Sequence, residues 1–126
     1  ANAADLIVIK AAPLGGVRRA LAIVEQAQLP AVVSSALETS VGIATGAALA
    51  ASLPTLKYGC GLGTVSLMAE DVAEDPMIAH DGLMRVRAVE PDPQRLERLA
   101  ADEPTRRWWV ERVSRCHRVL ERIRRG

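Results

Sequence analysis

Residues 5–10 read Asp-Leu-Ile-Val-Ile-Lys, and this stretch decides the fold of the first half of the chain. Four consecutive apolar residues, three of them β-branched, are typical of a strand that is buried on both faces, as in a parallel sheet. A loop rich in Gly and Pro follows over residues 11–16. From Val17 the apolar side chains recur at helical spacing, so we predict a helix that ends near Gln28, ahead of Pro30.

The strand–loop–helix unit then repeats along the chain. Residues 31–35 predict a second buried strand, and residues 36–40 predict a polar loop whose last residue, Ser40, is the candidate helix cap. A helix made of very small side chains is predicted over residues 41–52. Residues 57–60 predict a third short strand, and a glycine-rich loop follows it. This alternation predicts parallel strands joined by right-handed crossovers.

The alternation stops after the glycine-rich loop. Residues 66–72 predict a short helix, and residues 83–89 alternate in a way that predicts an antiparallel or edge strand. We predict one helix from Asp92, followed by Pro at the first helical position, to Ala101. A last helix is predicted over residues 104–125, with an apolar stripe on one face and arginines on the others.

Three parallel strands with their helices would leave two open sheet edges. Buried parallel strands need both faces covered, and an unpaired edge exposes backbone groups. We therefore expect the first 65 residues to be an arc of a larger α/β barrel or sheet. The chain has no initiator Met, and we expect it to be a piece of a longer protein or one chain of a split protein.

The composition excludes several classes of protein. Of the 126 residues, 49% are hydrophobic and 25% are charged, which is ordinary for a globular protein and excludes disorder throughout. The sequence has no apolar stretch, free of charges and helix breakers, that is long enough to span a bilayer. Cys60 and Cys116 form neither a disulfide framework nor a zinc cluster by themselves, so we expect a reducing, cytoplasmic setting.

The charges are unevenly distributed along the chain. Residues 1–84 carry four basic and eight acidic side chains, whereas residues 85–126 carry twelve basic side chains, all of them Arg, and seven acidic ones. Nucleic-acid binding through the Arg-rich part would weaken steeply with salt. The chain has only three aromatic residues on which bases could stack, and its first half is acidic, so we expect no nucleic-acid partner.

Lys10 is the strongest candidate for a catalytic residue. It follows an apolar strand and precedes a loop with Gly and Pro, and in α/β barrels the carboxyl ends of the strands carry the catalytic side chains. Loss of water at such a place favours the neutral, basic form of a lysine. The alternative is a lysine at a strand end that extends into solvent.

Two further groups follow the next strands at the same end. Ser34 and Ser35 end the second strand, where their hydroxyls can hold a carboxylate or form an ordinary turn. Gly61 and Gly63 follow the third strand, where backbone N–H groups can approach an anionic ligand or form a plain turn. Because the carboxyl ends of parallel strands lie at one edge, we predict that these residues and Lys10 line one ligand site.

Three segments together resemble the o-succinylbenzoate synthases of the enolase superfamily, and the actinobacterial form most closely. They are residues 4–16 (ADLIVIKAAPLGG), residues 32–42 (VVSSALETSVG) and residues 60–64 (CGLGT). The combination is specific, although each segment alone is not. The resemblance extends to about residue 90, and the helix with the tryptophan pair is also similar to the actinobacterial C-terminus.

The resemblance implies an α/β fold, the C-terminal part of a modified (β/α)8 TIM-type barrel with strands six to eight. Residues 1–75 would form these βα units, and residues 76–126 would return as a strand and helices that pack on the barrel and the capping domain. The implied reaction is the dehydration of 2-succinyl-6-hydroxy-2,4-cyclohexadiene-1-carboxylate to 2-succinylbenzoate in menaquinone synthesis.

The resemblance also assigns roles to the candidate residues. Lys10 matches the strand-six lysine that stabilises the anionic intermediate. Ser35, with Ser34, matches the strand-seven position that contacts the succinyl part of the substrate, and Gly61 matches the strand-eight backbone position near the same group. The implied partners are a small-molecule substrate and the remainder of the barrel with its capping domain. We expect no membrane partner.

The resemblance implies a magnesium ion that binds the substrate carboxylate and stabilises the enediolate formed when the α-proton is removed. The family's Lys-x-Lys strand and its three acidic metal ligands have no counterpart here, since Asp5 begins its strand and Glu38 lies beyond the second strand. We therefore expect the magnesium ligands in a preceding part of the protein, and we expect these 126 residues alone to be inactive.

Two other functions stay open on the sequence alone. N-acylamino-acid racemases share the scaffold and the strand-six lysine, so this region separates them poorly from o-succinylbenzoate synthases. A non-catalytic interaction module, which would dock on a partner through its open sheet edges, is the alternative outside the enzymes. Such a module would aggregate or bind a partner, whereas an enzyme piece would regain metal-dependent activity when joined to the missing part.

Overall fold

The computed structural model describes residues 3–126, which form two compact units. The first unit extends to Leu96, and the second begins at Glu97. Ala1 and Asn2, the first residues of the predicted barrel segment, lie outside the described residues. The two strands and the candidate site belong to the first unit.

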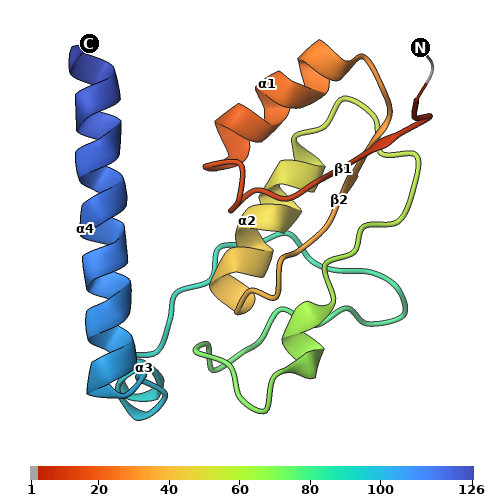
Figure 1. Cartoon of the computed structure of the whole chain (residues 1–126). Coiled ribbons are helices and arrows are strands. Elements are labelled where there is room, and N and C mark those ends of the chain that lie inside the picture. The colour runs from red at the N-terminus through yellow and green to blue at the C-terminus, as the bar shows by residue number, and fades with distance from the viewer. Residues whose placement is uncertain (1–2) are drawn as a thin grey trace. The chain divides into compact units, whose positions relative to one another are not determined.

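Two short parallel strands form the sheet of the first unit (Figure 1). β1 (Ile7–Ile9) pairs with β2 (Ala31–Val33), which confirms the predicted parallel pairing. The expectation that β1 is buried on both faces is wrong, because Ile9 is 3% exposed but Val8 is 60% exposed. Side chains alternate between the faces of a strand, and the helices of this unit cover only the face that carries Ile9.

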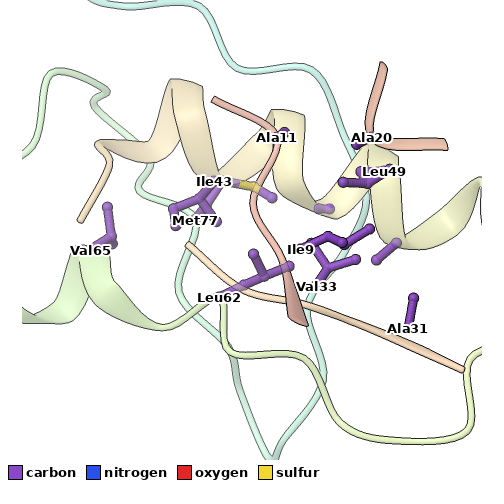
Figure 2. Packing of buried hydrophobic residues seen from close by; sticks show 12 residues of the cluster. Ile9, Ala11, Ala20, Ala31, Val33, Ile43, Leu49, Leu62, Val65 and Met77 are labelled. Atoms are coloured by element: carbon purple, nitrogen blue, oxygen red, sulfur yellow. The ribbon is translucent and has the colours of Figure 1, made fainter. Parts of the chain in front are cut away.

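Two helices pack on that covered face. α1 (Val17–Ala27) contacts β1, and α2 (Ser40–Ala51) contacts β2, close to the bounds that the helical spacing predicts. Figure 2 shows Ile43 and Leu49 of α2 facing the strands, where they join Val33 in the buried cluster. These three side chains are fully buried, and burial of each contributes roughly 1.5–3 kcal/mol to folding.

The small side chains of α2, which packs on the sheet, also allow a loop to approach the helix closely. A Cβ atom on Gly46 would lie 2.7 Å from Leu62 Cδ2, a distance at which something must shift. Leu62 is itself buried in the core cluster. Glycine at position 46 therefore lets the loop after residue 60 pack directly on the helix.

The predicted third strand over residues 57–60 is wrong. Only one parallel bridge forms there, between Ser34 and Gly61, with the Gly61 N–H donating to Val33 O at 2.8 Å. Residues 57–59 are exposed, so no packing holds them extended beside β2. The single bridge still brings Gly61 to the carboxyl end of β2.

A buried carboxylate, rather than the predicted Ser40 cap, satisfies the start of α2. Thr39 is the N-cap residue and Ser40 is the first helical residue. The Ser40 N–H donates to Asp71 Oδ1 at 3.0 Å, and the Ser40 hydroxyl accepts from the Met77 N–H at 2.7 Å. Ser40, Asp71 and Met77 are all buried, and a negative charge at a helix N-terminus is favourable.

The segment after Gly63 is mostly irregular. η1 (Thr64–Leu67), a single turn of 3-10 helix, forms where we predicted a helix over residues 66–72. The Ser66 hydroxyl donates to Gly63 O within this turn. The helix does not continue, because the chain turns back so that Asp71 can bind the start of α2.

The predicted strand over residues 83–89 is also wrong. Its pairing is limited to one antiparallel bridge between His80 and Leu83, around a turn in which Asp81 and Gly82 have positive φ angles. The two strands described among residues 3–126 pair with each other, and residues 83–89 pair with neither of them.

Two helices end the chain. α3 (Pro93–Arg98) starts as predicted, with the Asp92 carboxylate accepting a backbone hydrogen bond in the first turn, but it ends before the predicted Ala101. α4 (Glu103–Arg125) matches its prediction, and the Asp102 carboxylate caps it. Among residues 3–126 there is no helix of the length and apolar character needed to cross a membrane.

Candidate active site

Lys10 and Ser34 follow their strands directly and lie beside each other. The register of the sheet pairs Ile9 with Val33, so the next residue of each strand continues the ladder. The Ser34 N–H donates to Ile9 O at 2.9 Å, which confirms that continuation. Because side chains alternate, Lys10 and Ser34 both lie on the face opposite Ile9, which the helices do not cover.

The Lys10 ammonium group is held by the end of β2. Nζ donates to Ser34 Oγ at 3.0 Å and to the backbone carbonyl oxygen of Ser35. The side chain is half-buried, so it is placed against the second strand rather than extended into solvent. An ammonium group has three N–H donors, so one donor remains for a ligand.

The hydroxyl of Ser35 is already engaged. Ser35 is 6% exposed, and its Oγ donates to Gly61 O at 3.0 Å, while its N–H donates to the same oxygen at 2.9 Å. The Ser34 hydroxyl accepts from Lys10 Nζ, but as a donor it makes only a long contact, 3.4 Å, to Ser35 O. Of the two serines, Ser34 is therefore the one whose hydroxyl can turn toward a ligand.

Four of the five residues predicted for the ligand site meet at one place, and the fifth, Gly63, lies two positions further along the loop. The bridge between Ser34 and Gly61 joins the end of β2 to the glycine-rich loop, and Lys10 contacts both serines. A Cβ atom on Gly61 would lie 3.1 Å from Ser34 Oγ, so glycine keeps the space beside that hydroxyl open. The geometry agrees with the predicted ligand site, and the contacts with a substrate stay a prediction.

Thr64 also belongs to this cluster, and the sequence reasoning missed it. Its Oγ1 donates to Ser35 Oγ at 2.9 Å. The sequence feature that marks Thr64 is a hydroxyl residue at the end of the glycine-rich loop, at the same end of the sheet as the serines.

The described residues do not fit a magnesium site. Residues 3–126 contain no group of three or more His, Cys, Asp or Glu side chains close enough to hold a metal ion. The cluster around Lys10 offers an ammonium group, hydroxyls and carbonyl oxygens, and a positive charge opposes the binding of a second cation. Acidic oxygen ligands, which Mg²⁺ requires, are lacking at this position.

Comparison with curated proteins finds close relatives of one name. The chain is 53% identical over 120 residues to o-succinylbenzoate synthase of Mycolicibacterium smegmatis, and 50% identical over 122 and 119 residues to those of Mycobacterium ulcerans and Mycobacterium leprae. These matches cover 94–97% of this chain but only 35–37% of the relatives' length. No protein-family model matches the chain.

Comparison with solved structures finds part of a TIM-barrel-type enzyme fold. Muconate lactonizing enzyme from Pseudomonas putida matches with a TM-score of 0.68 and 28% identity, over 79% of this chain and 30% of that one. 2-Chloromuconate cycloisomerase from Rhodococcus opacus 1CP matches with the same TM-score and identity, over 80% and 30%. These structures confirm the predicted α/β fold class, and the named relatives confirm the resemblance that the motifs indicate.

Proposed function

We propose that this chain, which belongs with the o-succinylbenzoate synthases of the enolase superfamily, forms one wall of a lyase active site. The reaction is the dehydration of 2-succinyl-6-hydroxy-2,4-cyclohexadiene-1-carboxylate to 2-succinylbenzoate. One observation carries the proposal: the Lys10 ammonium group is fixed at the carboxyl ends of two parallel strands, in a chain about half identical to enzymes of that name.

Lys10 stabilises negative charge in this proposal. Both partners of Nζ are hydrogen-bond acceptors, so the side chain is arranged as a donor. Its remaining N–H is available to the oxygen that becomes negative when the substrate loses its α-proton. A charge that is already in place needs no reorganisation during the reaction, which is the main advantage of electrostatic catalysis.

The other residues of the cluster bind and position the substrate. The Ser34 hydroxyl donates to a carboxylate of the substrate, because as a donor it makes only a long contact within the chain. Gly61 leaves space beside it for the succinyl arm. The Ser35 hydroxyl donates to Gly61 O and so joins the end of β2 to the glycine-rich loop.

The remainder of the site comes from elsewhere in the enzyme. In this proposal residues 1–75 form βα units six to eight of the barrel, and residues 76–126 pack on the barrel and its cap. Members of the enolase superfamily generally use magnesium, and the acidic ligands for it lie outside the cluster around Lys10.

The proposal is tested with the protein as its source organism makes it. The protein is incubated with the cyclohexadiene substrate and magnesium, and 2-succinylbenzoate is followed by chromatography. One enantiomer of an N-acylamino acid serves as the second substrate. Formation of 2-succinylbenzoate supports the proposal. Racemisation alone assigns the protein to the N-acylamino-acid racemases, and the lack of both reactions refutes an enzymatic role.

A further inference from the structure

Ser35 forms a junction between the lysine and the glycine-rich loop, because its carbonyl oxygen binds Lys10 and its hydroxyl binds the loop. The hydroxyl has one proton, and that proton is directed to Gly61 O at 3.0 Å. Its contact with Thr64 Oγ1, at 2.9 Å, therefore has Thr64 as the donor and Ser35 as the acceptor. The carbonyl oxygen of the same residue receives a hydrogen bond from Lys10 Nζ.

Burial makes this junction sensitive to its partners. Ser35 is 6% exposed, so water cannot readily replace a lost donor at its Oγ. Without the Thr64 donor, Ser35 Oγ loses one of its hydrogen bonds, and the Ser35 residue is free to shift its position. A shift of the Ser35 backbone moves the carbonyl oxygen that accepts the hydrogen bond from Lys10 Nζ.

We propose that Thr64 is a positioning residue, which acts through Ser35 to fix Lys10 for catalysis. Thr64 does not contact Lys10 itself; its influence passes from Oγ1 to Ser35 Oγ and from the Ser35 carbonyl to Nζ. The inference rests on the proposed function, because it assigns to Lys10 the charge-stabilising role described above.

The test replaces Thr64 with side chains of similar size. Thr64→Val keeps the shape and removes the donor, whereas Thr64→Ser keeps the donor. Ser66→Ala is the matched control, since the Ser66 hydroxyl donates to Gly63 O in the same 3-10 turn but does not contact Ser35. Thr45→Val is a second control, because Thr45 donates only within α2, to Val41 O.

The kinetic readout separates positioning from general loss of structure. We expect Thr64→Val to lower kcat about tenfold, as a misplaced charge would, with KM within about twofold of wild type. Thr64→Ser should restore kcat to within about twofold, and the two controls should keep it. If Thr64→Val does not fold, Thr64→Cys, a weak donor of similar volume, takes its place with the same expectation. A wild-type kcat in Thr64→Val, an equal loss in Ser66→Ala, or no recovery in Thr64→Ser would overturn the proposal.

A second readout needs no activity. The chain has two lysines, Lys10 and Lys57, and in protein labelled with ¹³Cε-lysine the signal of each is assigned by its loss in Lys10→Ala or Lys57→Ala. We expect the Lys10 signal to move in Thr64→Val and to stay in Ser66→Ala, with Lys57 unchanged in both. An unmoved Lys10 signal overturns the inference. A moved signal in a protein that forms no 2-succinylbenzoate upholds the link from Thr64 to Lys10 but overturns the proposed function.

Discussion

The substitution Asp71→Ala should destabilise the first unit more than any surface change of the same kind. The carboxylate accepts the Ser40 N–H at 3.0 Å and, more weakly, the Ala73 N–H at 3.4 Å. Ser40 is fully buried, so its N–H would lose its partner without gaining water. A buried donor left unsatisfied costs about 1–3 kcal/mol, and a bond to a charged acceptor is at the upper end, so we expect a loss of roughly 2–3 kcal/mol.

Equilibrium urea unfolding, followed by circular dichroism at the helical band, measures this loss. Tryptophan fluorescence is unsuitable because both tryptophans lie in α4, outside the first unit. A loss of about 2–3 kcal/mol also lowers the midpoint of thermal unfolding. Asp71→Asn keeps one side-chain oxygen as an acceptor but loses the charge, so we expect it to lose about half as much.

Asp75→Ala is the matched control. Asp75 forms an ion pair with Arg87 at 2.8 Å, but its side chain is 85% exposed. Exposed ion pairs contribute about 0–1 kcal/mol, so this variant should unfold close to wild type. If Asp71→Ala is no less stable than Asp75→Ala, the buried carboxylate does not hold the start of α2 and the reasoning is refuted.

Two further predictions concern the same unit. Gly46→Ala should lower the free energy of unfolding by about 1–3 kcal/mol, because its Cβ would meet Leu62. Gly63→Ala, with open space around it, should change the free energy of unfolding by less than about 0.5 kcal/mol. Thermal unfolding compares the two variants. Burial raises the pKa of Asp71, but hydrogen bonds from Ser40 and Ala73 together outweigh it and place the pKa below the ordinary 3.8. The stabilisation by the Asp71 carboxylate is therefore complete above the pKa of the unfolded state and disappears as the pH falls through the lower pKa of the folded state. The free energies of unfolding of wild type and Asp71→Ala should converge in acid. A difference in urea stability that stays constant down to about pH 2 would contradict this.

The sequence predicts the elements that are local. α1 and α4 follow from helical spacing and from their end signals, because the information lies within each segment. Parallel pairing of β1 with β2 follows from the alternation of strand and helix. The meeting of Lys10 with the serines follows from that pairing, because the carboxyl ends of parallel strands share one edge.

The parts that the sequence does not predict depend on contacts between distant segments. Residues 57–60 have strand-like composition, but residues 57–59 are exposed and only Cys60 packs against the core, so only the bridge at Gly61 forms. Asp71 binds Ser40 across 31 positions of the chain, and no local pattern marks that pair. Thr64 binds Ser35 across 29 positions of the chain, in a loop whose Leu62 packs against Gly46 of α2.

Comparison of Lys10→Ala with Lys57→Ala shows whether Lys10 stabilises charge in a site that forms 2-succinylbenzoate. These are the two lysines of the chain, and Lys57 is exposed. We expect Lys10→Ala to lower kcat by about 10²–10³-fold, the usual loss on removal of one donor to a developing oxyanion, and Lys57→Ala to keep it within about twofold. A wild-type kcat in Lys10→Ala, or an equal loss in both variants, would contradict the account.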